Sequence, residues 1–193
     1  NESNPEKLAD LVCALEPTFG AINLEDIKAP DCFITEKICR ERMGIPVFHD
    51  DQHGTAIVVG AAARNALHVA KKSFEDIKVV STGGGAAGIA CLNMLMKLGV
   101  KRENIWLCDL HGLVYEGRTE DMHPMKAAFA HKHDLRTLDA LIAGPDLFPA
   151  PPAPTLLKPA HAPPLSKRPP IPATPTATTR ISPAKPPPSP RRP

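Results

Sequence analysis

The chain has 193 residues with 23 prolines and a formal net charge of +2 at pH 7, and its length allows one complete domain or parts of two. The charge conceals two unlike regions: residues 1–148 carry 16 Lys and Arg and all 21 Asp and Glu, whereas residues 149–193 carry 7 Lys and Arg and no acid. The acidic balance of the first region gives no sign of a nucleic-acid or membrane partner, and no apolar run approaches the roughly 18 residues of a membrane span.

The five cysteines, Cys13, Cys32, Cys39, Cys91 and Cys108, are odd in number and form no C-x-x-C pair. The chain also shows no signal-peptide pattern. These features predict a reduced, cytoplasmic setting. Cys91 and Cys108 lie in apolar segments, so we expect them to be packing residues.

The first predicted element is an amphipathic helix. Asn4 and Pro5 have the pattern of a helix cap followed by a first-turn proline. Apolar residues then recur at the spacing i, i+3, i+4 and i+7. We expect the inward face to be made by Leu8, Leu11, Val12 and Leu15.

A buried strand is predicted over residues 19–24, and the acid pair Glu25–Asp26 stands at its end. A helix is predicted next over residues 30–43, with Phe33, Ile34 and Ile38 inward and Gly44 in the left-handed position that ends it.

The stretch PVFHDDQHGTA, residues 46–56, contains a second acid pair. Its first residues have the pattern of a strand and the segment from Gln52 to Ala70 that of a buried helix, so Asp50 and Asp51 follow a strand. Consecutive strand ends of a parallel sheet lie at one edge, which predicts that Glu25, Asp26 and Asp51 meet. Adjacent carboxylates that stay ionised need a cation nearby, and oxygen ligands suit Mg²⁺ or Mn²⁺.

Two alternatives remain open for these residues. Glu25 and Asp26 could instead be acids at a helix start that interact with its dipole. His49 and His53 have the i, i+4 spacing of zinc hydrolases, but that motif requires one helix across both histidines and a Glu where Asp50 stands. Structural histidines, which orient Asp50 or cap the next helix, are the interpretation that we prefer.

A second pattern begins at Ile77, with a strand over residues 77–82, a glycine-rich loop, a helix to about Leu98 and a strand over residues 104–109. The glycines at 83, 85 and 88 fit G-x-G-x-x-G, and Asp109 ends the second strand 21 residues after the last of them. This arrangement predicts a dinucleotide site. Its cofactor-binding residues are Gly83, Gly84, Gly85, Ala86, Ala87, Gly88 and Asp109. An acid that accepts hydrogen bonds from ribose hydroxyls favours NAD without excluding NADP.

The remaining elements are less regular. Residues 114–118 are predicted to be a solvent-facing loop, residues 120–131 and 137–143 to be helical, and residues 146–148 to take the place of the third strand of a βαβαβ unit. Of the 23 prolines, 17 lie at or beyond Pro149, so residues 149–193 are predicted to be disordered. This tail is either a proline-rich ligand for SH3-type domains or an out-of-frame translation of GC-rich DNA.

Three segments together carry a resemblance to a known family: 15–30 (LEPTFGAINLEDIKAP), 45–56 (IPVFHDDQHGTA) and 101–106 (KRENIW). On these segments, residues 1–148 resemble the middle of a bacterial malic enzyme. The resemblance implies that Glu25, Asp26 and Asp51 hold Mg²⁺ or Mn²⁺ and that Asp50 is an active-site acid with a supporting catalytic role. It implies oxidative decarboxylation of malate to pyruvate and CO₂ with reduction of NAD or NADP, in a homo-oligomer.

The sequence also departs from that family. The family's proton-transferring Tyr and Lys lie upstream of the acid pair, and only 24 residues precede Glu25 here. The family's later Asn-Pro segment is absent, and its usual Gly-Ala-Gly is replaced by three glycines, which adds flexibility. We therefore expect the 193 residues alone to be inactive, and a non-catalytic NAD(P)-binding or interaction module is the alternative.

The predicted fold class is α/β. We expect the C-terminal part of a parallel-sheet substrate and metal domain over residues 1–56 and the first half of a Rossmann-type NAD(P)-binding domain over residues 57–148. The proline-rich tail follows over residues 149–193.

Overall fold

The computed structural model describes residues 2–138, 141, 145–149 and 171–172. Within these residues the helices are α1 (Pro5–Ala14), α2 (Asp31–Arg42), α3 (Thr55–Ala70), α4 (Ala86–Lys97) and α5 (Pro124–Ala127). The strands are β1 (Ile22–Leu24), β2 (Val47–His49), β3 (Val79–Ser81), β4 (Ile105–Asp109), β5 (Gly112–Leu113), β6 (Leu147–Phe148) and β7 (Ile171–Pro172). The α/β fold class is confirmed.

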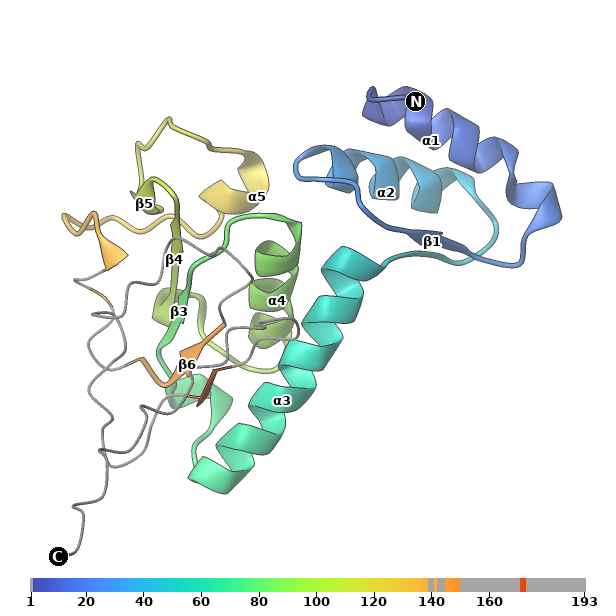
Figure 1. The fold of residues 1–193 in the computed structure, drawn as a ribbon. Coiled ribbons are helices and arrows are strands. Elements are labelled where there is room, and N and C mark those ends of the chain that lie inside the picture. Colours follow the sequence, from blue (N-terminus) through green and yellow to red (C-terminus); the bar gives the residue numbers. More distant parts are fainter. Residues whose placement is uncertain (1, 139–140, 142–144, 150–170, 173–193) are drawn as a thin grey trace, which may run out of the picture.

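Strand β1, helix α2 and strand β2 form a small βαβ unit beside α1 (Figure 1). Strands β1 and β2 are parallel and α2 connects them, with Leu24 opposite His49 in the register. The predicted cap is confirmed, because the Asn4 side chain accepts a hydrogen bond from the Lys7 amide at 2.9 Å. The core of this unit is small and contains buried Ala9, Cys39 and Met43.

The inward faces of α1 and α2 differ from the sequence prediction. Leu11 and Leu15 are 59% and 50% exposed, because α1 turns Ala9 toward α2. On α2 the prediction for Ile34 was wrong, since its side chain is exposed. The buried stripe of α2 instead contains Cys32, Thr35, Glu36 and Cys39, a helical i, i+3, i+4, i+7 pattern that includes two polar residues.

The end of α2 is also different. Met43 leaves the helix in an extended conformation with φ −92°, so Gly44 is not the left-handed cap that we expected. Gly44 instead donates its amide hydrogen to the Glu16 carboxylate at 2.7 Å. At the end of α4, by contrast, Gly99 has φ +117°, the left-handed conformation in which a glycine commonly ends a helix.

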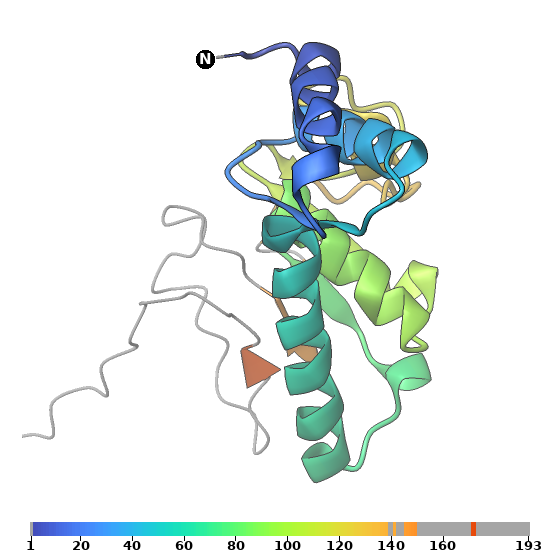
Figure 2. The same cartoon turned by 90° about the vertical axis from the view of Figure 1, so that its right-hand side faces the viewer.

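Helix α3 leaves the small unit and lies beside α4, which covers one face of a five-stranded sheet (Figures 1 and 2). The strand order is β5-β4-β3-β6-β7. Strand β3 is parallel to both β4 and β6, whereas β5 is antiparallel to β4. The boundary predicted between residues 56 and 57 falls inside the first turn of α3, which is continuous.

The position of β6 corrects the predicted topology. In a βαβαβ unit the third strand lies outside the second, which here is β4. The chain instead turns tightly after β4, and β5 pairs with its outer edge through Cys108 and Leu113. The next parallel strand therefore joins the free edge of β3, where Leu147 pairs with Val79. The strand order reverses at this point.

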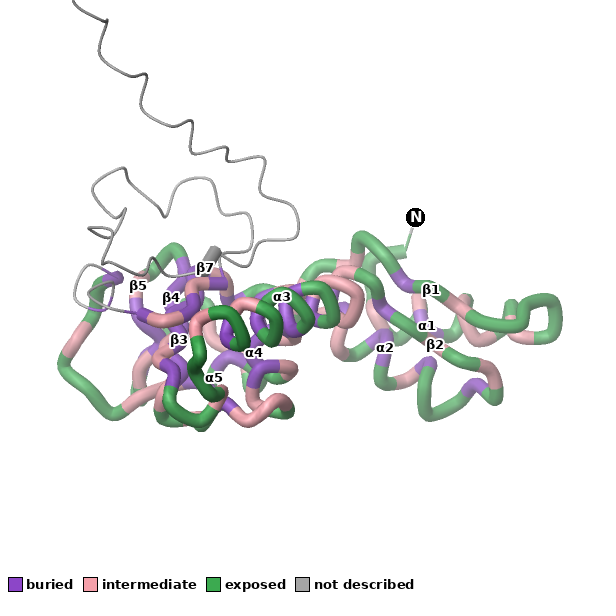
Figure 3. The backbone as a smooth tube through the Cα atoms, turned by 90° about the horizontal axis from the view of Figure 1, so that it is seen from below, coloured by how far each residue is buried: buried purple, intermediate pink, exposed green. Residues whose placement is uncertain are grey.

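The two faces of this sheet bury different apolar clusters, and Figure 3 shows the buried residues concentrated in its strands and in α4. Val79, Ile105 and Leu107 face α3 and α4. Val80 and Cys108 point to the other face with Leu113. This alternation is the period-2 pattern of a strand that is covered on both sides.

The helix predicted over residues 120–131 is mostly not formed, and of the range 137–143 the structure describes only residues 137, 138 and 141. Only α5, four residues long, is helical in the first range, because Pro124 lacks an amide hydrogen and so opens a new helix with His123 as its cap. Most of the second range lies outside the described residues, as does most of the predicted disordered tail. Ile171 and Pro172 differ from that prediction, since they form the strand β7 that pairs with the outer edge of β6.

Candidate functional site

The glycine-rich loop connects β3 to α4 at the carboxyl end of the sheet. Gly85 immediately precedes α4 and is exposed, and a Cβ built there would meet no atom within 4 Å. A Cβ on Gly88 would lie 1.9 Å from the Gly83 carbonyl oxygen, so only glycine lets the first turn of α4 pack on the loop. This loop lies where the strand order reverses, the place where open α/β sheets bind ligands, and a helix N-terminus there attracts phosphate.

The middle glycine has a role that sequence reasoning missed. A Cβ on Gly84 would lie 2.7 Å from Cε of Lys126, whose side chain crosses the loop and is 3% exposed. The Lys126 ammonium is held by the Asp109 carboxylate at 3.0 Å and by the carbonyl and carboxylate oxygens of Asp121, each at 2.6 Å. Gly84 therefore provides space for a fixed lysine, rather than only flexibility.

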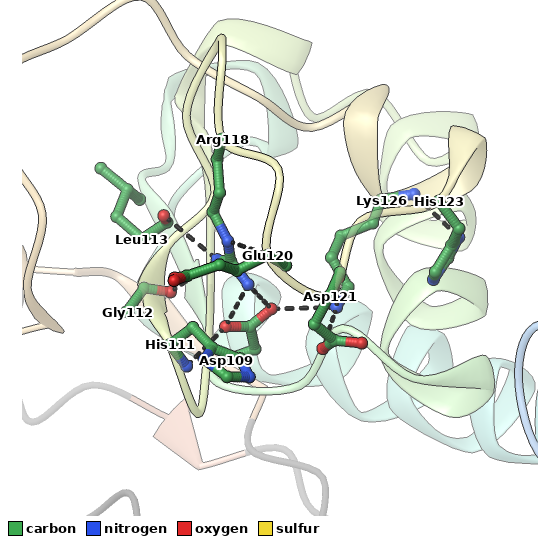
Figure 4. A network of polar contacts seen from close by, with 9 residues as sticks. All are labelled: Asp109, His111, Gly112, Leu113, Arg118, Glu120, Asp121, His123 and Lys126. Carbon is green, nitrogen blue, oxygen red and sulfur yellow. Dashed lines mark hydrogen bonds and ion pairs between the residues drawn. The ribbon is translucent and has the colours of Figure 1, made fainter.

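Asp109 is the centre of a buried polar network (Figure 4). Nη2 of Arg118 donates to both of its carboxylate oxygens, at 2.8 and 2.6 Å. The His111 amide donates to Oδ1 at 2.9 Å, and Lys126 donates to Oδ2. Burial by itself raises the pKa of Asp109, but the hydrogen bonds from Arg118 and Lys126 outweigh burial and hold that pKa below its usual value.

This network changes the expected role of Asp109. The carboxylate is 6% exposed in the folded chain, and each oxygen already accepts two hydrogen bonds. A ribose hydroxyl would have to displace one of those donors, so the argument from Asp109 for NAD over NADP loses its basis. The acid was correctly placed at the strand end, but its neutralising cations were not foreseen.

Arg118 was missed because residues 114–118 were predicted to face solvent. Val114 and Arg118 are in fact buried. The segment folds back along β4, and Arg118 also donates to the carbonyl of Leu113 at 3.2 Å. The sequence feature that could have pointed to Arg118 was Asp109 at a strand end, because a buried acid requires a cation nearby.

The two acid pairs lie at neighbouring strand ends, as the parallel pairing predicted. The Asp26 amide donates to Oδ2 of Asp51 at 2.8 Å, and this bond joins the end of β1 to the end of β2. Asp26 itself has φ +59°, a left-handed conformation. Glu25 accepts a hydrogen bond from the Asn23 side chain at 3.0 Å. The alternative of a helix start is not supported, because α2 begins only at Asp31.

The donor chemistry of Glu25, Asp26 and Asp51 fits a hard divalent cation, because all three supply carboxylate oxygens at one edge. Asp26 and Asp51 are in direct contact. Across the part of the chain that the structure describes, however, no group of three His, Cys, Asp or Glu residues is assembled as a metal site. The structure thus brings the predicted ligands to one edge without forming their full cluster.

Asp50 and Asp51 begin a wide π-type turn, Asp50–Gly54, that leads into α3. A Cβ on Gly54 would lie 2.1 Å from Oδ1 of Asp50, so glycine leaves the space that the Asp50 carboxylate occupies. On its other side the turn contacts Glu36 of α2 through Gln52 and His53. Neither Glu36 nor Gln52 was predicted to belong to the site.

The histidine alternative is resolved by the secondary structure. His49 is in β2 and His53 is in the turn, so no helix spans both, as a zinc hydrolase motif would require. His53 contacts Glu36 rather than Asp50, and α3 has no side-chain cap. His49 is fully buried, and neither of its ring nitrogens has a hydrogen-bond partner among the residues that the structure describes.

The fold and the loop define this chain as a small βαβ unit followed by a Rossmann-type α/β domain. Residues 52–142 match the family described as "Malic enzyme, NAD binding domain". The chain is 54% identical over 149 residues to the NADP-dependent malic enzyme of Haemophilus influenzae and 54% identical over 154 residues to the NAD-dependent malic enzyme of Rhizobium meliloti. The aligned residues are 77% and 80% of this chain and 20% of each relative.

A solved structure gives the same result. The NAD-dependent malic enzyme of Thermotoga maritima superposes with a TM-score of 0.76 at 42% sequence identity, over 83% of this chain and 44% of that one. Over the residues that these comparisons cover, the chain is similar to malic enzymes. It spans about a fifth of the length of the curated relatives that it matches.

Proposed function

We propose that this chain supplies the dinucleotide site and the cation-binding carboxylates of an enzyme that oxidises and decarboxylates malate to pyruvate and CO₂. The observation that carries the proposal is the open space at Gly85, in a glycine loop at the switch point of a malic-enzyme domain. The relatives are named as NAD- or NADP-dependent malic enzymes, so the oxidant proposed here is NAD or NADP.

The loop would bind the pyrophosphate. The backbone around Gly85 can approach the pyrophosphate closely because Gly85 has no side chain, and the N-terminus of α4 favours the negative charge of the pyrophosphate. We assign this role to the backbone of the segment from Gly83 to Gly88. Asp109 would act through Lys126, which it holds beside Gly84 of the loop, rather than by direct contact with ribose.

The acid pairs would bind Mg²⁺ or Mn²⁺, with Glu25, Asp26 and Asp51 as ligands. A divalent cation bound there would polarise the oxygens of malate and stabilise the negative charge that develops as CO₂ leaves. Asp50 would be the adjacent acid, in the place that Gly54 leaves open. These roles are supported by the contact between Asp26 and Asp51 and by the parallel register of their strands.

The domain assignment follows from the same residues. We propose that residues 1–56 belong to the substrate and metal domain and residues 57–148 to the NAD(P)-binding domain. We also propose a cytoplasmic setting, supported by the free cysteines, of which Cys32, Cys39, Cys91 and Cys108 are buried, and a homo-oligomeric assembly of the intact enzyme. Among the described residues, no helix has both the length and the apolar composition to cross a membrane.

Calorimetric titration of the 193-residue chain with NAD⁺ and with NADP⁺ tests the dinucleotide site directly. Saturable binding of at least one of them is expected, and binding of neither would refute this part of the proposal. A second titration with Mn²⁺, in buffer without dinucleotide, tests the carboxylates. A malate-dependent assay for NAD(P)H in the presence of Mn²⁺ then separates a catalytic chain from a binding module.

A further inference from the structure

Glu36 is a buried carboxylate whose two oxygens both point at the Asp50–Gly54 turn. It lies on the inward stripe of α2 and is 7% exposed. Nε2 of Gln52 donates to Oε2 at 3.1 Å, and Nε2 of His53 donates to Oε1 at 2.5 Å. A buried charge is costly unless it is paired and hydrogen-bonded, so these contacts are needed to keep Glu36 inside.

The partners of Glu36 are themselves held in place. Gln52 is 4% exposed. The His53 ring also contacts the Phe48 ring, with centroids 5.7 Å apart. Arg40, one turn along α2, lies 3.6 Å from Oε1 of Glu36 and adds a positive charge on the exposed side. Glu36 thus connects one helix to two successive residues of the turn.

The turn needs such an anchor. A π-type turn has a wide backbone ring with weaker hydrogen-bond geometry than an α-helix, and turns of this kind are common at functional sites. Asp50 and Asp51 directly precede Gln52, so fixing Gln52 and His53 from the α2 side fixes the direction in which the two acids leave β2. Asp51 is then in position to accept the hydrogen bond from Asp26.

We propose that Glu36 is a positioning residue that anchors the Asp50–Gly54 turn and thereby orients Asp50 and Asp51. The proposal deepens the proposed function, on which the role of those two acids rests. Glu36 itself is not expected to touch substrate or cation, because both of its oxygens face the turn.

The test compares three variants of the full chain by amide hydrogen exchange measured by NMR. Glu36→Ala removes both acceptors, and Glu36→Gln keeps one acceptor and the side-chain volume. Glu41→Gln is the matched control on the same helix, because the Glu41 side chain is 63% exposed and pairs with Lys37 at the surface, at 3.9 Å. Exchange reports local opening of the turn separately from global unfolding.

We expect amides 51–55 to exchange about tenfold faster or more in Glu36→Ala, with a smaller increase in Glu36→Gln, while amides of β3 and α4 keep their wild-type rates. If Glu36→Ala fails to fold, Glu36→Gln decides the question. Exchange in the turn that matches the Glu41→Gln control in the folded Glu36 variants would overturn the proposal.

A Mn²⁺ titration of the same proteins adds a second measurement. Weaker Mn²⁺ binding in Glu36→Ala than in Glu41→Gln is expected if the turn orients Asp51. Absence of Mn²⁺ binding in the wild type would refute the proposed cation site, whereas the exchange rates of residues 51–55 would still decide whether Glu36 anchors the turn. The two failures are therefore distinguishable.

Discussion

Arg118 donates from a single nitrogen to both carboxylate oxygens of Asp109, and both side chains are almost fully buried. The pair closes the end of β4 and fixes the chain that follows it. Asp109 also accepts a hydrogen bond from Lys126, whose side chain lies against Gly84 of the glycine loop.

Replacing Asp109 by Asn should destabilise the chain by about 3–5 kcal/mol, because Arg118 would keep a buried charge without its counter-charge and Lys126 would keep only the exposed Asp121. Urea denaturation measures this difference. Asp134→Asn, at an exposed position, is the control and should change the free energy of unfolding by less than about 0.5 kcal/mol. A loss in Asp109→Asn below about 1 kcal/mol would show that the pair contributes little.

The same pair predicts a pH dependence with a definite sign. Its partners hold the folded pKa of Asp109 below the unfolded value of about 3.9, so its contribution is complete above that value and is lost as the pH falls through the lower folded pKa. Wild-type stability should therefore fall more steeply below about pH 4 than that of Asp109→Asn. Parallel stability curves for the two proteins in that range would contradict the assignment.

Gly85→Ala should leave the fold intact and impair the dinucleotide site. Its φ of −81° suits alanine and the added Cβ meets no protein atom, so the free energy of unfolding should change by less than about 1 kcal/mol. NAD(P) affinity should fall about tenfold or more, because the methyl group enters the space assigned to the pyrophosphate. Gly20→Ala, also in open space, is the control, and equal affinities in the two variants would argue against this loop as the binding site.

Gly84→Ala should lower the stability of the fold, in contrast to Gly85→Ala, which should mainly lower NAD(P) affinity. The new Cβ would contact the fixed stem of Lys126, and crowding of this kind costs about 1–3 kcal/mol. In a Lys126→Ala background most of that cost should disappear. A double-mutant cycle by urea denaturation measures the coupling, for which we expect about 0.5–3 kcal/mol. Additive effects would show that Gly84 does not make room for Lys126.

Cysteine reactivity should follow burial. Burial raises the pKa of the Cys91 thiol to about 11, and burial together with the charge of Asp109 raises that of Cys108 to about 12. Cys13, which is partly exposed, should react with iodoacetamide first. Cys91 and Cys108 should react on the order of a hundredfold more slowly until denaturant is added. Mass spectrometry of labelled peptides gives the order, and early labelling of Cys108 would contradict the burial of β4.

The effects of substituting Asp50 and Gly54 on stability should be coupled, as those of Gly84 and Lys126 should be. A Cβ at 54 would displace the Asp50 carboxylate, so Gly54→Ala should destabilise the wild type more than it destabilises Asp50→Ala, by about 0.5–3 kcal/mol. Denaturation of the two single variants and the double variant measures this difference. Equal costs in both backgrounds would indicate that Asp50 does not lie against Gly54.

The sequence by itself determined the local elements and the types of residue at the site. The helix cap at Asn4, the loop with Gly88 and the acid at the end of β4 depend on interactions between near neighbours, so spacing and residue type were enough to predict them. The same holds for the parallel pairing of β1 and β2, since a helix connects them.

Only the tertiary structure decided which distant groups meet. The burial of Arg118, the path of Lys126 across Gly84, the contact of Glu36 with the turn and the position of β6 beside β3 all join segments that are not adjacent in the chain. Such contacts depend on which sheet edge is free and on where a buried charge finds its partner. Those conditions arise from packing of the whole domain, and periodicity along the chain does not specify them.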